Sequence, residues 1–311
     1  MTERLAILVP VLDDWESFAT LVRRISAAVP DAEIVAVDDG SSEPFDPALL
    51  APPTGMRVSI VRLVVNLGHQ RAIAVGLSVL SKRHDLDAIV VMDSDGEDRP
   101  EDIAALCEAA RENLGHAVLA RRTKRSERGV FRAGYFLYKL LFRTLTGRTI
   151  DFGNFSLLPM PIVRRLVYMP ELWNNLPAAV IRSRVRTAAV PLARGTRYAG
   201  QSKMNLASLV VHGLSAMSVY TDVIFVRIIL LAGFVAGVAM LGMLAVLGTR
   251  VFTNLGIPGW ATTVFGDLMI ILMQTLVMVI ATSLVLLAGR SQRPIVPAID
   301  APTFIADRGG L

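Results

Sequence analysis

Cysteine is almost absent from this 311-residue sequence, and Cys107 by itself cannot form an internal disulfide bond. A single thiol is typical of a protein that works in a reducing compartment. The Gly-rich dinucleotide-binding fingerprint and the Walker phosphate loop are absent as well. The sequence therefore indicates neither an NAD-binding domain nor a P-loop nucleotidase.

Charged residues are missing from two long stretches near the C-terminus, Ile228–Gly248 and Leu268–Gly289. Each has roughly the 20 apolar residues that a helix needs to cross a bilayer. They bring the chain to 53% hydrophobic residues and a mean hydropathy of +0.50, which is high for a soluble enzyme. We predict a transmembrane hairpin with spans at 223–249 and 267–289 and an external loop at 250–266. Two buried helices of a large core are the alternative.

The residues that flank this hairpin predict its orientation. Arg227 precedes the first span, and Arg290 and Arg293 follow the second. The loop between the spans holds only Arg250. By the positive-inside rule both termini lie in the cytoplasm, with 290–311 as a cytoplasmic tail. For a chain with two spans, a net charge of +5 and a pI near 9.7 favour an anionic membrane surface or a phosphorylated substrate over nucleic acid.

Residues 1–200 alternate short apolar runs with segments of helical spacing, which is typical of an α/β domain with a parallel sheet. The predicted strands are Leu5–Val11, Glu33–Val37, Val58–Val65, Ala88–Met92 and Thr187–Leu192. The predicted helices are Asp14–Val29, Gln70–Lys82 and Ala104–Asn113. A sheet of this kind binds its ligand at the carboxyl ends of its strands.

Polar side chains follow three of these strands, at the point where each strand ends. They are Asp38 and Asp39, then Asn66-Leu67-Gly68, then Asp93-Ser94-Asp95-Gly96-Glu97. Two carboxylates one residue apart, such as Asp93 and Asp95, suit Mg²⁺ or Mn²⁺ bound together with substrate phosphates. For a lone Asp-x-Asp, an acidic turn in solvent is the alternative.

Basic segments occupy the middle of the chain. Region 128–146 combines Arg and Lys with an apolar face, which predicts a basic amphipathic helix at the membrane interface. A core-packed helix with a solvated basic face is the alternative. Asp151–Phe155 is predicted as a polar turn, and 201–222 as a juxtamembrane amphipathic segment. The loop Arg197–Lys203 has basic ends that could clamp phosphates, although such loops also precede spans for topological reasons.

Together these motifs resemble glycosyltransferase family 2, the inverting nucleotide-sugar enzymes of GT-A fold. The resemblance rests on Val37-Asp38-Asp39-Gly40-Ser41, the Asn-x-Gly that follows, and Asp93-Ser94-Asp95. The loop Arg197-Tyr-Ala-Gly-Gln-Ser-Lys203 resembles the Arg-x-x-Gly-x-Ser-Lys of polyprenyl- and dolichyl-phosphate sugar synthases. Two C-terminal spans match their bacterial, membrane-anchored branch. The resemblance implies a Rossmann-like mixed α/β sheet with helices on both faces, followed by the transmembrane hairpin.

The resemblance also implies roles for individual residues. Asp93 would meet the donor, Asp95 and Glu97 would bind Mg²⁺ or Mn²⁺, and Asp93, Asp95, Arg122 and Asp151 are the catalytic candidates. The donor-binding set would be Pro10, Leu12, Asp14, Val37, Asp39, Asp93, Arg122, Arg197 and Lys203. Arg122, Arg125 and Arg132 would hold an acceptor phosphate.

Three positions depart from the family pattern. Glu97 stands where Gln is common, which adds charge to the predicted metal site. The family motif Asp-x-Gly-Asp-Phe-Arg has Asn154 and Ser156 in place of a carboxylate and an arginine, which puts the acceptor site in question. Met204 replaces a frequent aromatic residue after the lysine.

We therefore expect a metal-dependent transferase that moves a hexose from a UDP- or GDP-sugar to polyprenyl phosphate at the cytoplasmic membrane, for cell-envelope glycan synthesis. The alternatives are a glycan or lipid hydroxyl as acceptor, or a non-catalytic subunit that binds nucleotide sugars. A phosphate acceptor is already anionic, so it needs no strong base, whereas a hydroxyl acceptor does, and Asp151 is the nearest candidate. Gly233 and Gly237 form a Gly-x-x-x-Gly in the first span, which leaves a homo-oligomer open.

Overall fold

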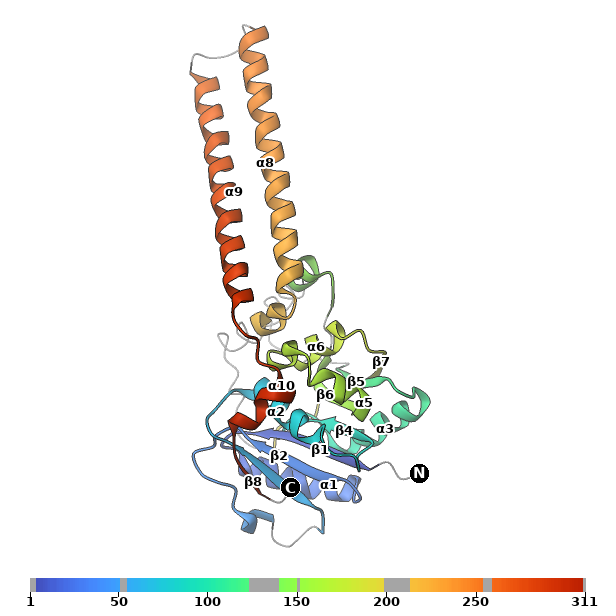
Figure 1. Cartoon of the computed structure of the whole chain (residues 1–311). Helices are drawn as coiled ribbons and strands as arrows, with labels where there is room; N and C mark the ends of the chain where they lie inside the picture. The colour runs from blue at the N-terminus through green and yellow to red at the C-terminus, as the bar shows by residue number, and fades with distance from the viewer. Residues whose placement is uncertain are drawn as a thin grey trace. The chain divides into compact units, whose positions relative to one another are not determined.

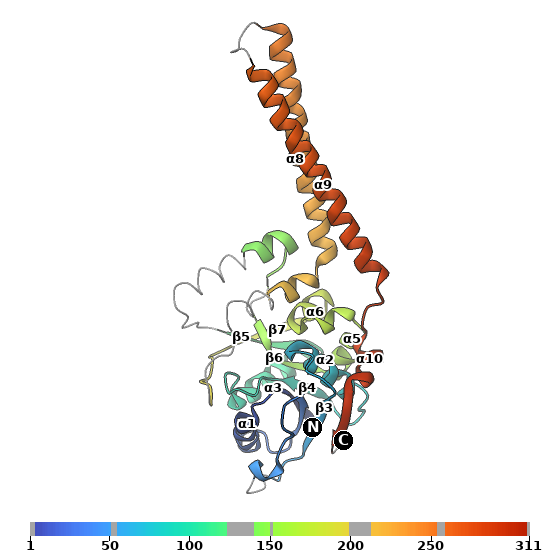
Figure 2. The same ribbon diagram turned by 90° about the vertical axis from the view of Figure 1, so that its left-hand side faces the viewer.

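The computed structural model describes residues 4–50, 55–122, 140–149, 152–198, 213–253 and 259–309. The chain divides into two compact units. The first comprises Met1–Leu140, Arg148–Val219 and Pro294–Leu311, and the second comprises Leu141–Gly147 and Tyr220–Arg293. The sheet belongs to the first unit, and the two long C-terminal helices belong to the second (Figures 1 and 2).

One mixed sheet runs through the first unit. In the described part of the chain it has eight strands in the order β7-β5-β6-β4-β1-β2-β3-β8. β1, β2, β3 and β4 run parallel, as do β5 and β7, whereas β6 is antiparallel to β4 and β5, and β8 is antiparallel to β3. The strands are β1 (Leu5–Val11), β2 (Glu33–Asp38), β3 (Val58–Leu63), β4 (Ala88–Val91), β5 (Ala117–Arg122), β6 (Phe152–Pro159), β7 (Thr187–Leu192) and β8 (Ile305–Gly309). The predicted mixed α/β sheet is confirmed.

Helices cover both faces of this sheet (Figures 1 and 2). Alternate residues of β1 serve the two faces, so that Ile7 and Val9 join the core around Phe18 of α1, whereas Leu8 joins the core beneath α2. α1 (Trp15–Ala28) and α3 (Ile103–Glu112) cover one face, and α2 (His69–Leu80), α5 (Met160–Leu166) and α6 (Leu176–Arg182) cover the other. Shorter helices are η1 (Pro47–Leu50), η2 (Pro100–Asp102), η3 (Pro170–Trp173), α10 (Pro297–Asp300) and η4 (Ala301–Phe304).

The end of the chain returns to the sheet, although the sequence predicted 290–311 as a tail. Ser78 Oγ donates to the carbonyl oxygen of Pro297 at 2.8 Å, and the Val64 N–H donates to that of Phe304 at 2.9 Å. β8 then pairs with β3 as an edge strand. The chain before and after the two long helices thus belongs to one folded unit, and the helical hairpin is an insertion into it.

The second unit contains α8 (Thr221–Phe252) and α9 (Trp260–Ser291), each of 32 residues. At 1.5 Å per residue such a helix is about 48 Å long, which exceeds the hydrocarbon core of a bilayer at about 30 Å. Each contains a stretch of 18 residues with a mean hydropathy of 2.5, and both leave large apolar side chains exposed, such as Phe234 and Met273. Exposing an apolar surface of this extent to water is energetically unfavourable, so both helices are candidate membrane spans.

The segment that begins at Asp151 differs from the sequence prediction. The polar turn expected at Asp151–Phe155 is instead, from Phe152 onward, the first half of β6, which pairs with both β4 and β5. Polar side chains at Asn154 and Ser156 hid this strand, because they interrupt the apolar run that marks a buried strand. Of the predicted amphipathic segment 128–146, only 140–146 lies within the described residues, and it is helical.

The docking of the C-terminal segment can be tested at Phe304, whose ring lies 5.1 Å from that of Trp173. We expect Phe304→Ala to lower the free energy of unfolding of the first unit by about 2 kcal/mol, because a partly buried aromatic contact is lost. Denaturant unfolding of the detergent-solubilised chain, followed by tryptophan fluorescence, measures this. Ile299→Ala is the control, since Ile299 is 59% exposed in the same segment. Equal effects of the two substitutions would contradict docking.

Candidate active site

The parallel strands β1, β2 and β4 end at one edge of the sheet, and the loops after β1 and β2 are joined to one another. The Asp39 N–H donates to the carbonyl oxygen of Val11 at 2.9 Å. Asp13 Oδ1 accepts from the N–H and the hydroxyl of Ser42, at 2.8 and 2.7 Å. These two loops therefore form one surface at the carboxyl edge.

The residues predicted to contact a nucleotide divide into accessible and buried ones. Leu12 is 37% exposed and Asp14 is half-buried before α1, whereas Pro10 is buried within β1. Val37 is fully buried, and a Cβ on Gly76 of α2 would lie 2.8 Å from its Cγ2. The side chain of Val37 thus packs in the core and does not face the edge.

Asp39 is a structural carboxylate in this arrangement. Its two oxygens accept from the N–H groups of Leu67 and Gly68, at 2.7 and 2.9 Å, and the residue is 2% exposed. Burial raises the pKa of Asp39, although the two N–H groups act against that rise. Asp39 thus holds the loop after β3 in place.

The acidic turn after β4 is held by its own carboxylates. Asp98 is buried, and its Oδ2 accepts from the Asp93 N–H at 3.0 Å. Asp95 Oδ1 accepts from the Glu97 N–H at 2.9 Å, and Gly96 between them has φ +88°, a value that favours glycine. These bonds leave the second oxygen of Asp95 and both oxygens of Glu97 for other partners.

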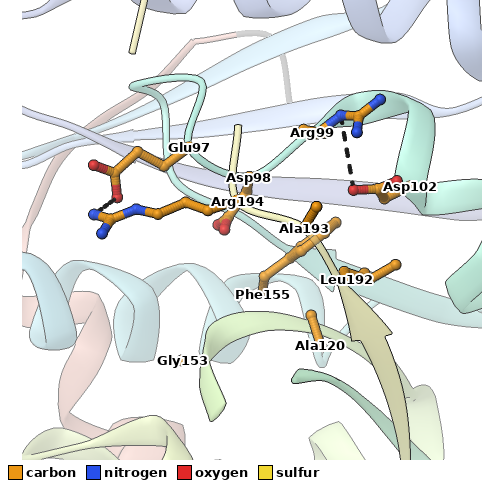
Figure 3. A pocket seen from close by; sticks show the side chains of 10 residues that line it. All are labelled: Glu97, Asp98, Arg99, Asp102, Ala120, Gly153, Phe155, Leu192, Ala193 and Arg194. Carbon is orange, nitrogen blue, oxygen red and sulfur yellow. Dashed lines mark hydrogen bonds and ion pairs between the residues drawn. The ribbon is translucent and has the colours of Figure 1, made fainter. Parts of the chain in front are cut away.

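Those partners are two arginines from the loop after β7. Arg197 Nη2 lies 2.8 Å from Asp95 Oδ2, and Arg197 Nε donates to Glu97 Oε1 at 2.9 Å. Arg194 pairs with the other oxygen of Glu97. Figure 3 shows Arg194 and Glu97 facing one another at one end of a cleft, with Arg99 and Asp102 at its other end. Residues of β5, β6 and the end of β7 also line this cleft, including Ala120, Phe155 and Leu192.

The protonation of the turn reflects these contacts. Burial raises the pKa of Asp95, and the negative charges of Asp93 and Glu97 add to the rise. Burial acts in the same direction on Glu97, but hydrogen bonds from Arg194 and Arg197 outweigh it and lower the pKa of Glu97. The turn therefore requires positive charge to keep its carboxylates ionised together.

The backbone brings the loop after β7 against this turn. The Gly195 N–H donates to the carbonyl oxygen of Glu97 at 2.8 Å, and the Tyr198 N–H donates to that of Asp95 at 3.0 Å. A Cβ on Gly195 would lie 2.3 Å from the carbonyl oxygen of Gly96, and a Cβ on Gly96 would lie 2.7 Å from the Tyr198 ring. Only glycine allows this approach from either side.

Two carboxylates that share a cation suit a divalent metal. In the described part of the chain no group of three or more His, Cys, Asp or Glu side chains is placed to hold a metal ion. Mg²⁺, however, commonly takes only one or two carboxylates and completes its shell with water and substrate phosphates. The guanidinium of Arg197 between Asp95 and Glu97 marks a place where these residues accept positive charge. The carboxylate oxygens of Asp95 and Glu97 therefore fit Mg²⁺ or Mn²⁺ as ligands.

His69 is a site residue that the sequence analysis missed. It begins α2, and its Nε2 lies 3.2 Å from Asp93 Oδ1 and 2.9 Å from Asn154 Nδ2. Burial lowers the pKa of His69, but the carboxylates of Asp93, Asp39 and Asp98 together raise it by more, so the pKa lies above its ordinary value. The available signal was its position directly after Asn66-Leu67-Gly68, at the end of a predicted strand.

Five of the predicted residues cannot be placed in this site. Arg125, Arg132, Asp151 and Lys203 lie outside the described residues. Arg122 is the last residue of β5, but its side chain is outside the described part of the structure.

The mixed sheet with an acidic turn at its carboxyl edge is of the α/β class, and comparison with known proteins identifies its family. Residues 6–165 match the family described as glycosyl transferase family 2. The chain belongs to glycosyltransferase family 2, and the predicted resemblance is confirmed.

Relatives of known sequence include one named for undecaprenyl phosphate and one named for bactoprenol. The undecaprenyl-phosphate 4-deoxy-4-formamido-L-arabinose transferase of Edwardsiella ictaluri is 27% identical over 259 residues, covering 79% of this chain and 78% of the relative. The bactoprenol glucosyl transferase of Shigella phage SfV is 29% identical over 268 residues, covering 81% and 83%. The chain resembles both along most of its length.

A solved structure supports the fold. Glucosyl-3-phosphoglycerate synthase from Mycobacterium tuberculosis, in complex with Mn²⁺, UDP-glucose and phosphoglyceric acid, matches with a TM-score of 0.52. It is 17% identical in sequence, and the match covers 72% of this chain and 80% of that one. The shared GT-A fold is what this likeness establishes.

The structural role of Asp39 can be tested by Asp39→Asn. An amide oxygen can accept from only one of the two loop N–H groups, and the other is left facing an NH₂ group. We expect the free energy of unfolding to fall by about 1–3 kcal/mol. Asp46→Asn is the matched control, because Asp46 is exposed and accepts a single N–H from Ala48. Denaturant unfolding measures both, and an unchanged stability for Asp39→Asn would refute the assignment.

Proposed function

We propose that this protein transfers a hexose from a nucleotide-sugar donor to polyprenyl phosphate at the cytoplasmic face of a membrane, with inversion at the anomeric carbon. The observation that carries the proposal is the acidic turn bridged by Arg197 and Arg194 at the carboxyl edge of a glycosyltransferase family 2 sheet. The same chain holds two helices able to cross a membrane.

The donor side of the site matches a nucleoside diphosphate. Asp95 and Glu97 would hold Mg²⁺ or Mn²⁺, which when bound neutralises the charge that develops on the departing diphosphate. Arg197 contacts both carboxylates, so it lies where it can also bind a phosphate oxygen. Arg122 and Lys203 are proposed to join it, and Asp93 is proposed to meet the sugar. Leu12 and Asp14 are the accessible residues for the nucleoside.

The acceptor follows from chemistry and from the membrane helices. A polyprenyl phosphate is anionic at neutral pH, so its oxygen can attack the anomeric carbon without a strong base. The bond from that carbon to the diphosphate breaks in the same step, its electron pair leaves with the diphosphate, and the configuration inverts. Arg122, Arg125 and Arg132 are proposed to hold the acceptor phosphate, and both relatives described above carry lipid-linked names.

The position of the hairpin within the chain supports a common membrane side for both termini. Segments before α8 and after α9 fold into one unit, so the chain must cross the bilayer an even number of times between them. Arg227, Arg290 and Arg293 flank the hairpin where the chain leaves that unit and returns to it, and Arg250 lies at the opposite end of α8. The positive-inside rule then favours the cytoplasm for the catalytic unit.

Two alternatives remain distinct in their outcomes. In the first alternative the acceptor is a hydroxyl group, which needs a base, and Asp151 is the candidate for that base in the sequence. In the second, the protein is a subunit that binds nucleotide sugars without turnover, which would suit the departures from the family motif at Asn154 and Ser156. The purified chain with Mn²⁺, polyprenyl phosphate and a panel of radiolabelled UDP- and GDP-sugars should yield a labelled lipid. Turnover only onto hydroxyl acceptors, or binding without turnover across the panel, would replace the proposal by the corresponding alternative.

The metal assignment predicts that Asp95→Ala lowers transferase activity by about 100-fold or more while membrane insertion is retained, because the diphosphate loses its counter-charge. EDTA should have the same effect on the wild type, and added Mn²⁺ should reverse it. Asp85→Ala is the control, since Asp85 is an exposed residue paired with Arg83. Wild-type activity in Asp95→Ala, or in EDTA, would rule out the metal role.

Competition between arginine and metal gives a second prediction, with binding as its readout. Arg194→Ala removes a cation from Glu97, so we expect Mn²⁺ to bind about three- to tenfold more tightly in the absence of donor, measured by the EPR signal of free Mn²⁺. Arg99→Ala removes the same charge from a neighbouring position, where Arg99 lies 3.8 Å from Glu101. Equal affinities of the two variants would show that Glu97 does not bind the metal.

A further inference from the structure

Helix α9 carries a polar side chain, that of Gln274, near its middle. The helix runs from Trp260 to Ser291. At 1.5 Å per residue, Gln274 is about 21 Å from the start of a helix that is about 48 Å long. A hydrocarbon core of about 30 Å includes that point at every position at which it fits along the helix. When α9 spans a membrane, the Gln274 amide therefore lies within the hydrocarbon core.

This amide has no hydrogen-bond partner among the residues that the structure describes. The hydroxyl groups near it differ in this respect. Thr275 Oγ1 donates to the carbonyl oxygen of Ile271 at 2.7 Å, and the hydroxyls of Thr282 and Ser283 bond to their own helix in the same way. Lipid tails, the polyprenyl chain of the proposed acceptor included, offer Gln274 no donor or acceptor. A polar group left unpaired in hydrocarbon is costly, so the Gln274 amide requires a partner.

Gln274 lies on a side of α9 that α8 does not cover. The two helices run side by side (Figures 1 and 2), and a Cβ added to Gly242 of α8 would lie 3.1 Å from Leu268 Cδ1 of α9. Leu272 and Thr275 follow Leu268 at helical spacing on the same side and are half-buried. Gln274 is about 100° around the helix from Thr275, and it is exposed. The partner must therefore come from outside the hairpin.

Small residues extend this side of α9 at intervals of seven. Ala281 and Ala288 follow Gln274 in the sequence at that spacing, and all three are exposed. Seven residues make nearly two turns of an α-helix, so the three form one row. Small residues let a second helix approach closely within a membrane. Asp267 precedes them in the row, and repulsion between two such carboxylates limits a close contact to the part from Gln274 onward.

We propose that the row Gln274, Ala281 and Ala288 is the surface at which α9 associates with α9 of a second copy of this chain. Copies inserted in one membrane have the same orientation, so a two-fold axis along the membrane normal brings each residue of the row opposite its counterpart. A primary amide is complementary to itself, because each of the two can donate an N–H to the oxygen of the other. A second copy thus supplies the partner that Gln274 requires. The proposal goes beyond the sugar-transfer reaction and does not depend on it.

Disulfide cross-linking of the full chain in the membranes of an expressing bacterium tests the geometry. Each variant carries Cys107→Ser, which removes the single native thiol, together with Ala281→Cys or Ile280→Cys. Ile280 is 50% exposed at the same depth, and it lies about 100° around the helix from Ala281. We expect copper phenanthroline to link the Ala281→Cys chain into dimers at least about fivefold faster than the Ile280→Cys chain, because only the first brings two thiols together. Equal rates, a faster reaction at position 280, or a product with the mass of a different partner would overturn the proposal.

The role of the amide is tested by Gln274→Leu, which keeps an apolar side chain of similar size at this position. We expect it to weaken association by about 3- to 20-fold, the effect of interhelical hydrogen bonds in membranes. The measurement is energy transfer between chains with donor and acceptor dyes on an N-terminal tag, in liposomes over a series of protein-to-lipid ratios. Thr275→Val is the matched control, because the hydroxyl that it removes is bonded within the helix. Unchanged association in Gln274→Leu, or an equal loss in Thr275→Val, would refute the proposed contact.

Discussion

The bridge that Arg197 makes between Asp95 and Glu97 is the interaction on which the rest of the site depends. Carboxylates in one short, partly buried turn repel each other and lose hydration, so they stay ionised together only beside positive charge. The loop after β7 supplies that charge, and its backbone bonds to the turn require close approach at Gly96 and Gly195. A metal ion bound with a diphosphate would supply positive charge to the same carboxylates. For this reason the ion pairs that stabilise the turn lie at the proposed donor site.

The sheet that presents this turn also explains how a long helical hairpin can be part of a compact enzyme. The hairpin is inserted near the C-terminus, and the chain then returns to add β8 beside β3. Both of its ends are thereby tied to one folded unit. A membrane crossed by this hairpin would have both ends on one side, because a last segment on the other side could not complete the edge of the sheet.

Neutral amides organise the neighbourhood of His69, in contrast to the charged donor side. Gln70 accepts from the buried Leu176 N–H and donates to Asn154, and His69 lies beside both Asn154 and Asp93. The departure at Asn154, which in the sequence looks like a missing carboxylate, has a consistent place in this network.

The sequence itself determined β1, β2 and β4, because strands buried on both faces need apolar residues throughout. It also determined the two candidate spans, because the stretches within α8 and α9 that lack charged residues are long enough to cross a bilayer. The acidic turn was also predictable, since polar residues directly after such strands meet at one edge. Only the tertiary structure decided the rest. β6 contains Asn154 and Ser156 and becomes a strand through pairing on both sides, and the segment after α9 becomes structured only against β3. The roles of Asp39 and His69 could not be predicted from the sequence for the same reason. The role of a carboxylate or an imidazole is set by the groups that face it, and those groups come from distant parts of the chain.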